Sequence, residues 1–135
     1  MEYLPHLRHA EADGVKIHIS ALDRLFSQYI RTRDHWTCQR CGKVHPPPTM
    51  ALHCAHTYKR RHQLTRWDAD NADALCYGCH QYFEEHWPEH LTWKRQRIGH
   101  PRFQRLTRRH QMVGRVDVVA TALYYRQQLQ SPERR

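Results

Sequence analysis

Four of the five cysteines in this chain form two pairs with the same internal spacing, Cys38-x-x-Cys41 and Cys76-x-x-Cys79. A gap of two residues lets one tight turn present both sulfurs to a single ion, and Zn²⁺ prefers four soft ligands in a tetrahedron. The alternatives are four unrelated buried cysteines or a redox-active pair. We expect a structural zinc site that is coordinatively closed, and that therefore holds the fold together without catalysing a reaction.

The segment LHCAHTYKRRH, residues 52–62, adds histidines, the fifth cysteine and a run of basic residues. Because the paired cysteines would saturate a zinc ion, Cys54 is surplus to that site. In a β-strand, Cys54 and His56 would share one face, whereas His53 would point elsewhere. We expect Cys54 to be a small, partly buried residue that packs near a functional site, with a contact to a catalytic metal as the alternative.

The charge balance indicates a polyanionic partner. Among the 135 residues, 22 Lys and Arg stand against 13 Asp and Glu, which gives a formal net charge of +9. Such a charge on a small domain is typical of nucleic-acid binding, and arginine suits phosphate oxygens. No stretch approaches the roughly 18 apolar residues that span a membrane, and the N-terminus lacks the apolar core of a signal peptide. We therefore expect a cytoplasmic protein with reduced thiols and no membrane partner.

The elements that would position these residues divide the chain into four segments. They are a poorly ordered lead-in (1–16), an N-terminal helix (17–34), a zinc-bearing core (35–90) and a basic helical C-terminal extension (91–135). The segment MALHCAH is expected to be a strand, and TYKRRHQLTRWDADNADA is expected to be irregular. The segment LCYGCHQYFEEHW reads as a metal-binding turn that runs into a helix, which Pro88 ends. The fold class is α+β.

The two flanking helices have recognisable ends or faces. Ser20, followed by Asp23 three residues later, resembles an N-cap, and this helix should end near Arg33. A terminal helix, roughly residues 115–130, carries an apolar stripe that includes Val116 and Leu123. This stripe would either pack on the N-terminal helix or form the interface of a homodimer.

The segment AHTYKRRHQLTRWDADNADALCYGCH resembles the HNH motif of the His-Me finger, or ββα-metal, nucleases. His56 precedes Asn71 by fifteen residues and Asn71 precedes His80 by nine, which is similar to the nuclease domains of DNase colicins. The resemblance covers Thr37 to Trp87. More loosely, LDRLFSQYIRTRDHWTCQRCG together with LTRWDADNADALC resembles the phage NinG (Rap) recombination proteins. The implied fold is a small zinc-stapled, treble-clef HNH core with flanking N- and C-terminal helices.

The resemblance implies a metal-dependent DNA endonuclease and a role for each residue of the motif. His56 would be the general base, Asn71 its orienting residue and His80 a ligand of a catalytic Mg²⁺, Mn²⁺ or other divalent ion. Glu84, one helical turn after His80, is the second candidate ligand. The bland alternatives are a structural role for His56, a turn residue at Asn71 and a solvent-exposed glutamate at Glu84. The implied products carry a 5′-phosphate and a 3′-hydroxyl.

One departure from the family pattern concerns the metal. Many members carry Asp, His or Glu immediately before the base, where this chain has Ala55, which cannot coordinate an ion. The missing ligand would come from Glu84, from Cys54, or from water and substrate phosphate. Ala55 therefore favours a rival function, a non-catalytic treble-clef zinc module that only binds DNA. A zinc-dependent protein–protein adaptor is disfavoured by the net charge.

Basic residues lie in two groups that would meet the DNA backbone, double-stranded or branched, without an obvious base-reading pattern. The candidates are Lys59, Arg60, Arg61, Arg66, Arg102, Arg105, Arg108 and Arg109. Other histidines in polar surroundings are expected at the surface: His62, His86, His90 and His110. The implied setting is the cytoplasm of a phage-infected or lysogenic bacterium, in DNA recombination, branch processing or packaging.

Overall fold

The computed structural model describes residues 19–131, so the expected lead-in at residues 1–16 lies outside the described part. Within it, the chain forms an α+β fold of six α-helices, one short 3-10 helix and a two-stranded antiparallel sheet. The first helix, α1 (Ile19–Arg33), ends where the sequence predicts. Its expected N-cap is wrong, because Ser20 lies inside the helix.

The sheet pairs β1 (Leu52–His56) with β2 (Ala72–Cys76). The expected strand at MALHCAH is thus confirmed. The register sets His53 opposite Leu75, and the pairing continues one step beyond the strands, where the Thr57 N–H donates to the Asn71 carbonyl at 2.8 Å. The two strands are therefore held in one register over their whole length.

The connection between the strands is more regular than the sequence indicates. It forms α2 (Gln63–Arg66) and a 3-10 turn, η2 (Ala69–Asn71). Asp23 ties this connection to α1, since its carboxylate accepts hydrogen bonds from the Arg66 guanidinium at 2.6 and 3.1 Å and from the Trp67 indole at 2.8 Å. Asp23 therefore makes a tertiary contact and does not serve the helix cap that its spacing suggests.

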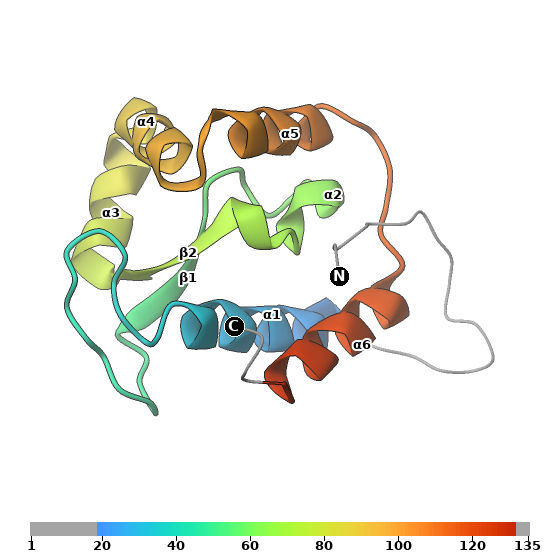
Figure 1. Cartoon of the computed structure of the whole chain (residues 1–135), viewed down its shortest axis with the longest axis horizontal. Coiled ribbons are helices and arrows are strands. Elements are labelled where there is room, and N and C mark those ends of the chain that lie inside the picture. Colours follow the sequence, from blue (N-terminus) through green and yellow to red (C-terminus); the bar gives the residue numbers. More distant parts are fainter. Residues whose placement is uncertain (1–18, 132–135) are drawn as a thin grey trace.

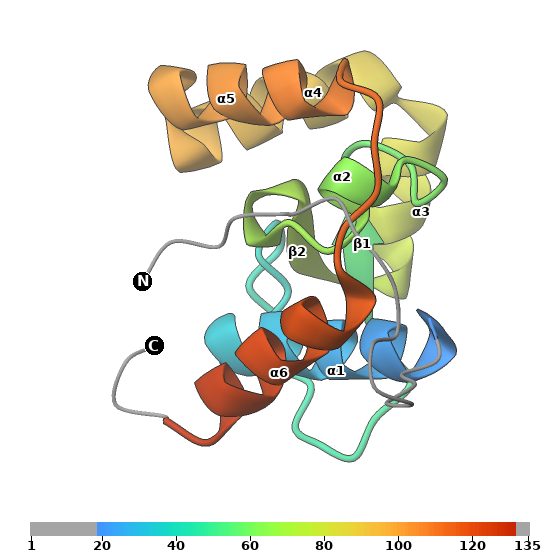
Figure 2. The same cartoon turned by 90° about the vertical axis from the view of Figure 1, so that its right-hand side faces the viewer.

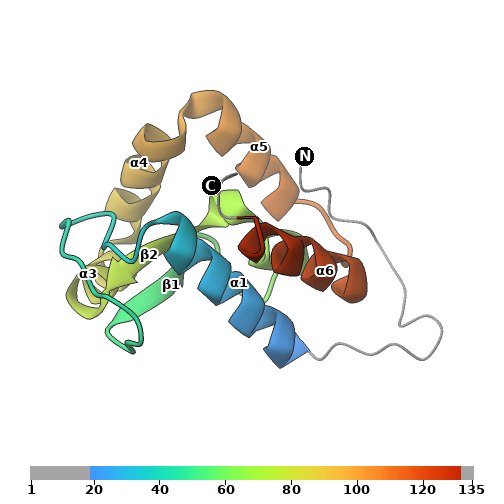
Figure 3. The same ribbon diagram turned by 60° about the horizontal axis from the view of Figure 1, so that its bottom comes forward.

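The helices lie in two groups on either side of the sheet (Figures 1 and 2). Directly after β2 comes α3 (Tyr77–Glu85), followed by α4 (Trp87–Ile98) and α5 (His100–His110). The expectation that Pro88 ends α3 is wrong: α3 ends at Glu85, and Pro88 lies in the first turn of α4, where a missing N–H costs nothing. The last helix, α6 (Val118–Leu129), returns to lie beside α1 on the other side (Figure 3).

The last helix, α6, packs on α1, which is the first of the two expectations for the terminal helix. Phe26 and Tyr125 meet edge to face with ring centroids 5.1 Å apart, inside one apolar cluster. The Tyr125 hydroxyl also donates to the Trp67 carbonyl. The predicted stripe is partly wrong: Val116 is buried, but Leu123 is 53% exposed. Asp117 is the N-cap of α6. The turn of α6 that contains Tyr125 faces α1.

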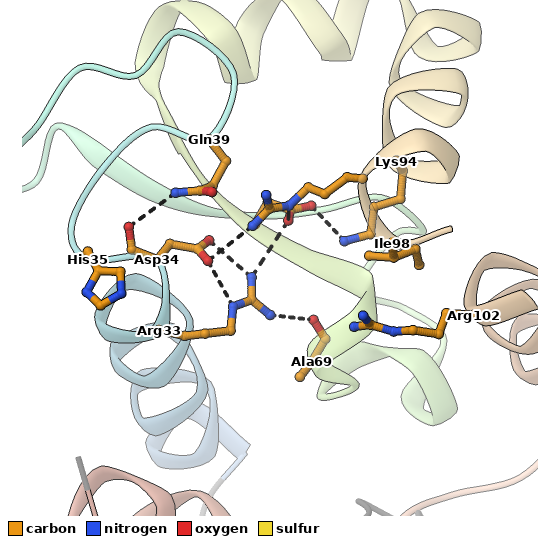
Figure 4. Close-up of a pocket in the computed structure, with 10 residues that line it drawn as sticks. Arg33, Asp34, His35, Gln39, Ala69, Lys94, Ile98 and Arg102 are labelled. Atoms are coloured by element: carbon orange, nitrogen blue, oxygen red, sulfur yellow. Dashed lines mark hydrogen bonds and ion pairs between the residues drawn. The ribbon is translucent and has the colours of Figure 1, made fainter. Parts of the chain in front are cut away.

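A buried ionic network joins α1, β2 and α4 (Figure 4). Lys94 and Asp73 are each 1% exposed, and their Nζ and Oδ2 atoms lie 2.8 Å apart. Arg97 and Arg33 also approach Asp73, and both contact Asp34, which is itself buried. Burial favours the neutral acid, but Lys94 and Arg97 outweigh it and lower the pKa of Asp73. The carboxylate is therefore charged and compensated.

We expect Asp73→Asn to lower the free energy of unfolding by about 3–5 kcal/mol, because Lys94 would stay buried without its counter-charge. Urea denaturation of the zinc-loaded protein measures the effect. The matched control is Asp70→Asn, which breaks the pair between Asp70 and the half-exposed Arg102 and should cost no more than about 1 kcal/mol. Equal losses in the two variants would contradict a structural role specific to Asp73.

Candidate metal centre and active site

The four paired cysteines come together at the junction of three elements. Cys38 and Cys41 lie in the turn after α1, Cys76 is the last residue of β2, and Cys79 lies in the first turn of α3. Their sulfur atoms all lie within 4.8 Å of one another. Gly42 closes the turn at φ 82°, a conformation that favours glycine. The cluster is compatible with a structural zinc ion, and this much of the prediction is confirmed.

The surroundings of the cluster act in opposite directions on two of its thiols, Cys38 and Cys79. Burial opposes ionisation of Cys38, but hydrogen bonds from the backbone at Cys41, Cys76 and Arg40 outweigh it and lower the pKa of the Cys38 thiol to about 7. Burial raises the pKa of Cys79 to about 12, against a hydrogen bond from the Arg40 guanidinium at 3.4 Å. The arginine charge would offset part of the negative charge that four zinc-bound thiolates carry.

Cys54 is separate from this cluster. It packs on the side of β1 that faces α1, against the apolar cluster around Phe26. Burial raises the pKa of the Cys54 thiol to about 12, so it stays protonated. A protonated, packed thiol is a poor metal ligand, and its position agrees with the expectation of a small residue used for packing.

His80 lies next to His53, which strand alternation directs away from His56. The Nδ1 atoms of His80 and His53 lie 2.9 Å apart, and burial lowers the pKa of His80. The Nε2 atom of His80 lies 3.5 Å from a Glu84 oxygen, whose carboxylate also pairs with Lys59 at 2.8 Å. The alternation along β1 does turn His53 away from His56, but that side of the strand is the one covered by α3. The alternation of side chains along β1, together with the position of α3 over that side of the strand, is the signal that would have predicted a role for His53.

His56 lies against α1, and the structure does not bring it into contact with His80. Its ring packs on Phe26 with centroids 5.7 Å apart, and its Nε2 atom lies 2.8 Å from the Arg66 carbonyl oxygen. Because a carbonyl can only accept, Nε2 must carry the proton, and the lone pair is left on Nδ1. Burial lowers the pKa of His56 to about 4, so the ring is neutral at pH 7.

Asn71 holds the loop that carries the partner of His56. The side chain is fully buried, donates to the carbonyls of Tyr58 and Thr65 at 2.9 Å, and accepts from the Tyr58 N–H at 2.8 Å. Thr65 directly precedes Arg66, whose carbonyl binds His56. Asn71 therefore acts on His56 through the backbone of α2. It is also the last residue of the turn η2, as the turn interpretation expects, and the orienting role in catalysis stays a prediction.

Most of the predicted DNA-binding residues form ion pairs within the protein. Lys59 pairs with Glu84, Arg60 and Arg66 pair with Asp23, Arg102 pairs with Asp70, and Arg109 pairs with Asp68. Among residues 19–131, no such pair engages three exposed cations of the predicted set, which are Arg61, Arg105 and Arg108. Within the predicted set, the cations without an ion pair therefore lie on α5 and on the loop after β1.

The loop after β1 borders a cavity of about 260 Å³ whose lining includes Glu84, Arg61, Trp87 and two of the histidines expected at the surface, His62 and His110. His90 is also expected at the surface, and for this residue the expectation is wrong. It is 4% exposed, contacts the Thr57 hydroxyl at 3.2 Å and stacks on Phe83 with centroids 4.4 Å apart. The apolar ring offered by α3 explains why a polar-looking segment buries a histidine.

Comparison of the chain with protein-family models, with curated proteins and with solved structures finds no match. Within residues 19–131, none of the helices combines the length and the apolar character needed to cross a membrane. Any functional assignment therefore depends on the geometry of the site and on the sequence motif.

We expect Cys76→Ser, or removal of the ion by a strong chelator, to unfold the domain, because the cluster joins the turn after α1 to the start of α3. Metal content by mass spectrometry and thermal melting by circular dichroism measure the outcome. The control is Cys54→Ser, which should leave the zinc content unchanged. A Cys76→Ser protein with the wild-type melting temperature and no bound zinc would contradict the structural role.

Proposed function

We propose that this protein is a metal-dependent HNH endonuclease that hydrolyses DNA phosphodiester bonds. The order β1, β2, α3, with a four-cysteine cluster at the base of α3 and His80 one residue after Cys79, supports a treble-clef ββα core. The motif in the sequence supports the same assignment. A phage or prophage setting, in DNA recombination, branch processing or packaging, is part of this proposal.

The observation that carries the proposal is the bond between His56 Nε2 and the Arg66 carbonyl. It fixes one tautomer of a neutral imidazole, so Nδ1 is ready to take a proton from water. Asn71 maintains this arrangement because it holds the backbone on both sides of the loop. A general base needs such orientation, since a freely rotating ring would spend little time aligned with the attacking water.

His80 is the residue that would carry the catalytic ion. It stands in the first turn of α3, half-exposed, with one ring nitrogen toward Glu84 and the other toward β1. A divalent ion bound there would neutralise charge on the scissile phosphate and on the leaving oxygen. In this proposal, the protein holds an unprotonated ring nitrogen of His80 at a fixed position. The unpaired arginines of α5 and of the loop after β1 would hold the neighbouring phosphates.

A specific observation favours the second candidate, a DNA-binding module without catalytic activity. The His56 ring packs on Phe26 of α1, whereas His80, on α3, contacts His53 of β1, so the two histidines have different neighbours. In this alternative the bond from His56 to Arg66 only shapes the loop. Both candidates bind DNA, and cleavage separates them.

We expect the wild-type protein to nick supercoiled plasmid in the presence of Mg²⁺ or Mn²⁺. His56→Ala and His80→Ala should each reduce the rate by about 10²–10⁴-fold, because each loses one catalytic group. Both variants should keep zinc and their fold. His86→Ala, at the exposed end of α3, is the matched control and should nick like the wild type. Background-level nicking by wild type and His56→Ala alike, with every metal tried, would establish the binding module instead.

We expect the double change of Arg105 and Arg108 to alanine to weaken DNA binding and to reduce the slope of log affinity against log salt by about two, one for each lost phosphate contact. Filter binding over a salt series measures this slope. Arg102→Ala, on the same helix, should change the slope less, since Arg102 already pairs with Asp70. A larger effect from Arg102→Ala than from the double variant would show that another face of α5 meets the DNA.

A further inference from the structure

The contact between His53 and His80 presents a problem of proton count. Two Nδ1 atoms 2.9 Å apart share a hydrogen bond only if one of them is protonated. The Nε2 atom of His80 faces the Glu84 carboxylate at 3.5 Å, which favours a proton on Nε2 and leaves the lone pair on Nδ1. In the absence of an ion, His53 must therefore keep its own proton on Nδ1 and donate it.

The same separation suits two ligands of one ion. Nitrogen atoms about 2.1 Å from a metal and at right angles to each other are about 3.0 Å apart, and a tetrahedral angle requires about 3.4 Å. The observed 2.9 Å therefore matches neighbouring positions of an octahedral site, and a tetrahedral site needs a shift of only a few tenths of an ångström. A neutral His53 binds the ion after its proton moves from Nδ1 to Nε2, so no charge has to be supplied.

The neighbouring residues determine what else such an ion would contact. Glu84 is drawn toward Lys59, with 2.8 Å between Oε1 and Nζ, and its other oxygen faces the Nε2 side of His80 rather than the Nδ1 side. Ala55 offers no ligand, and Cys54 lies on the other side of β1. The remaining positions around the ion are left to water or to phosphate oxygens.

We propose that His53 and His80 bind one divalent transition-metal ion through their Nδ1 atoms, with Glu84 as a hydrogen-bond partner of His80 outside the coordination shell. His53 supplies the ligand that Ala55 cannot. Because imidazole suits Mn²⁺, Co²⁺, Ni²⁺ and Zn²⁺ better than Mg²⁺, which prefers oxygen ligands, the site discriminates against Mg²⁺. The consequence for catalysis, faster nicking with Mn²⁺ or Co²⁺ than with Mg²⁺, rests on the proposed nuclease function.

The test is isothermal titration of the full-length, zinc-loaded protein with Mn²⁺, Co²⁺ and Ni²⁺, with native mass spectrometry to count the bound ions. The variants are His53→Ala and Glu84→Gln, and the matched control is His86→Ala, at the other end of α3. We expect the wild type to bind one ion in addition to zinc. Affinity should fall at least tenfold in His53→Ala, while Glu84→Gln and His86→Ala keep one-to-one binding.

Several outcomes overturn the inference. The wild type binding no second ion would show that the two histidines form only a hydrogen-bonded pair. Equal affinity in wild type and His53→Ala would remove His53 from the site, and loss of stoichiometric binding in Glu84→Gln would place Glu84 among the ligands. Nicking assays run beside the titration keep the proposals distinct. A bound ion without cleavage supports the metal site and contradicts the nuclease. Cleavage that His53→Ala does not affect supports the nuclease and contradicts the metal site.

Discussion

The convergence of four sulfur atoms within 4.8 Å is the constraint on which the arrangement of the site depends. The sheet has only two strands, and α3 begins at the residue after β2 ends. A metal ion held by Cys38, Cys41, Cys76 and Cys79 would tie the turn after α1 to the first turn of α3. His80 is the next residue after Cys79, so the same junction fixes the position of its backbone.

A second feature is the amount of charge that the protein uses internally. Asp73 and Lys94 are almost completely buried and compensate each other, and acidic residues of α1 and of the loop between the strands engage several arginines. Such pairs contribute little to stability when exposed but are costly to break when buried. The formal charge of +9 already counts these acids, so the internal pairs do not change the net excess of positive charge; they determine which cations are left available to a partner. Of the predicted DNA-binding residues in the described part of the chain, those without an ion pair are Arg61, Arg105 and Arg108, two of them on α5.

The strand β1 separates two kinds of histidine. His53 faces α3 and meets His80, while His56 faces α1 and is held by the Arg66 carbonyl. One residue is suited to metal binding, because its Nδ1 atom lies beside a second imidazole. The other has a fixed tautomer and is unprotonated at neutral pH, while the burial that lowers its pKa to about 4 also makes it a weaker base than a free imidazole. The proposed reaction needs both histidines, and substrate would have to reach His56 Nδ1 and the ion together.

The local spacing of residues determined the two cysteine pairs, the end of α1 at Arg33 and the placement of His80 at the start of a helix. These features depend on contacts between residues close in the chain, where turn geometry and helical periodicity are sufficient. The contact of His53 with His80 spans 27 residues, and that of Arg66 with Asp23 spans 43. The packing of α3 on β1 and of the loop on α1 decided these contacts. Only the tertiary structure could therefore separate the arginines that hold the fold together from those left free for a partner.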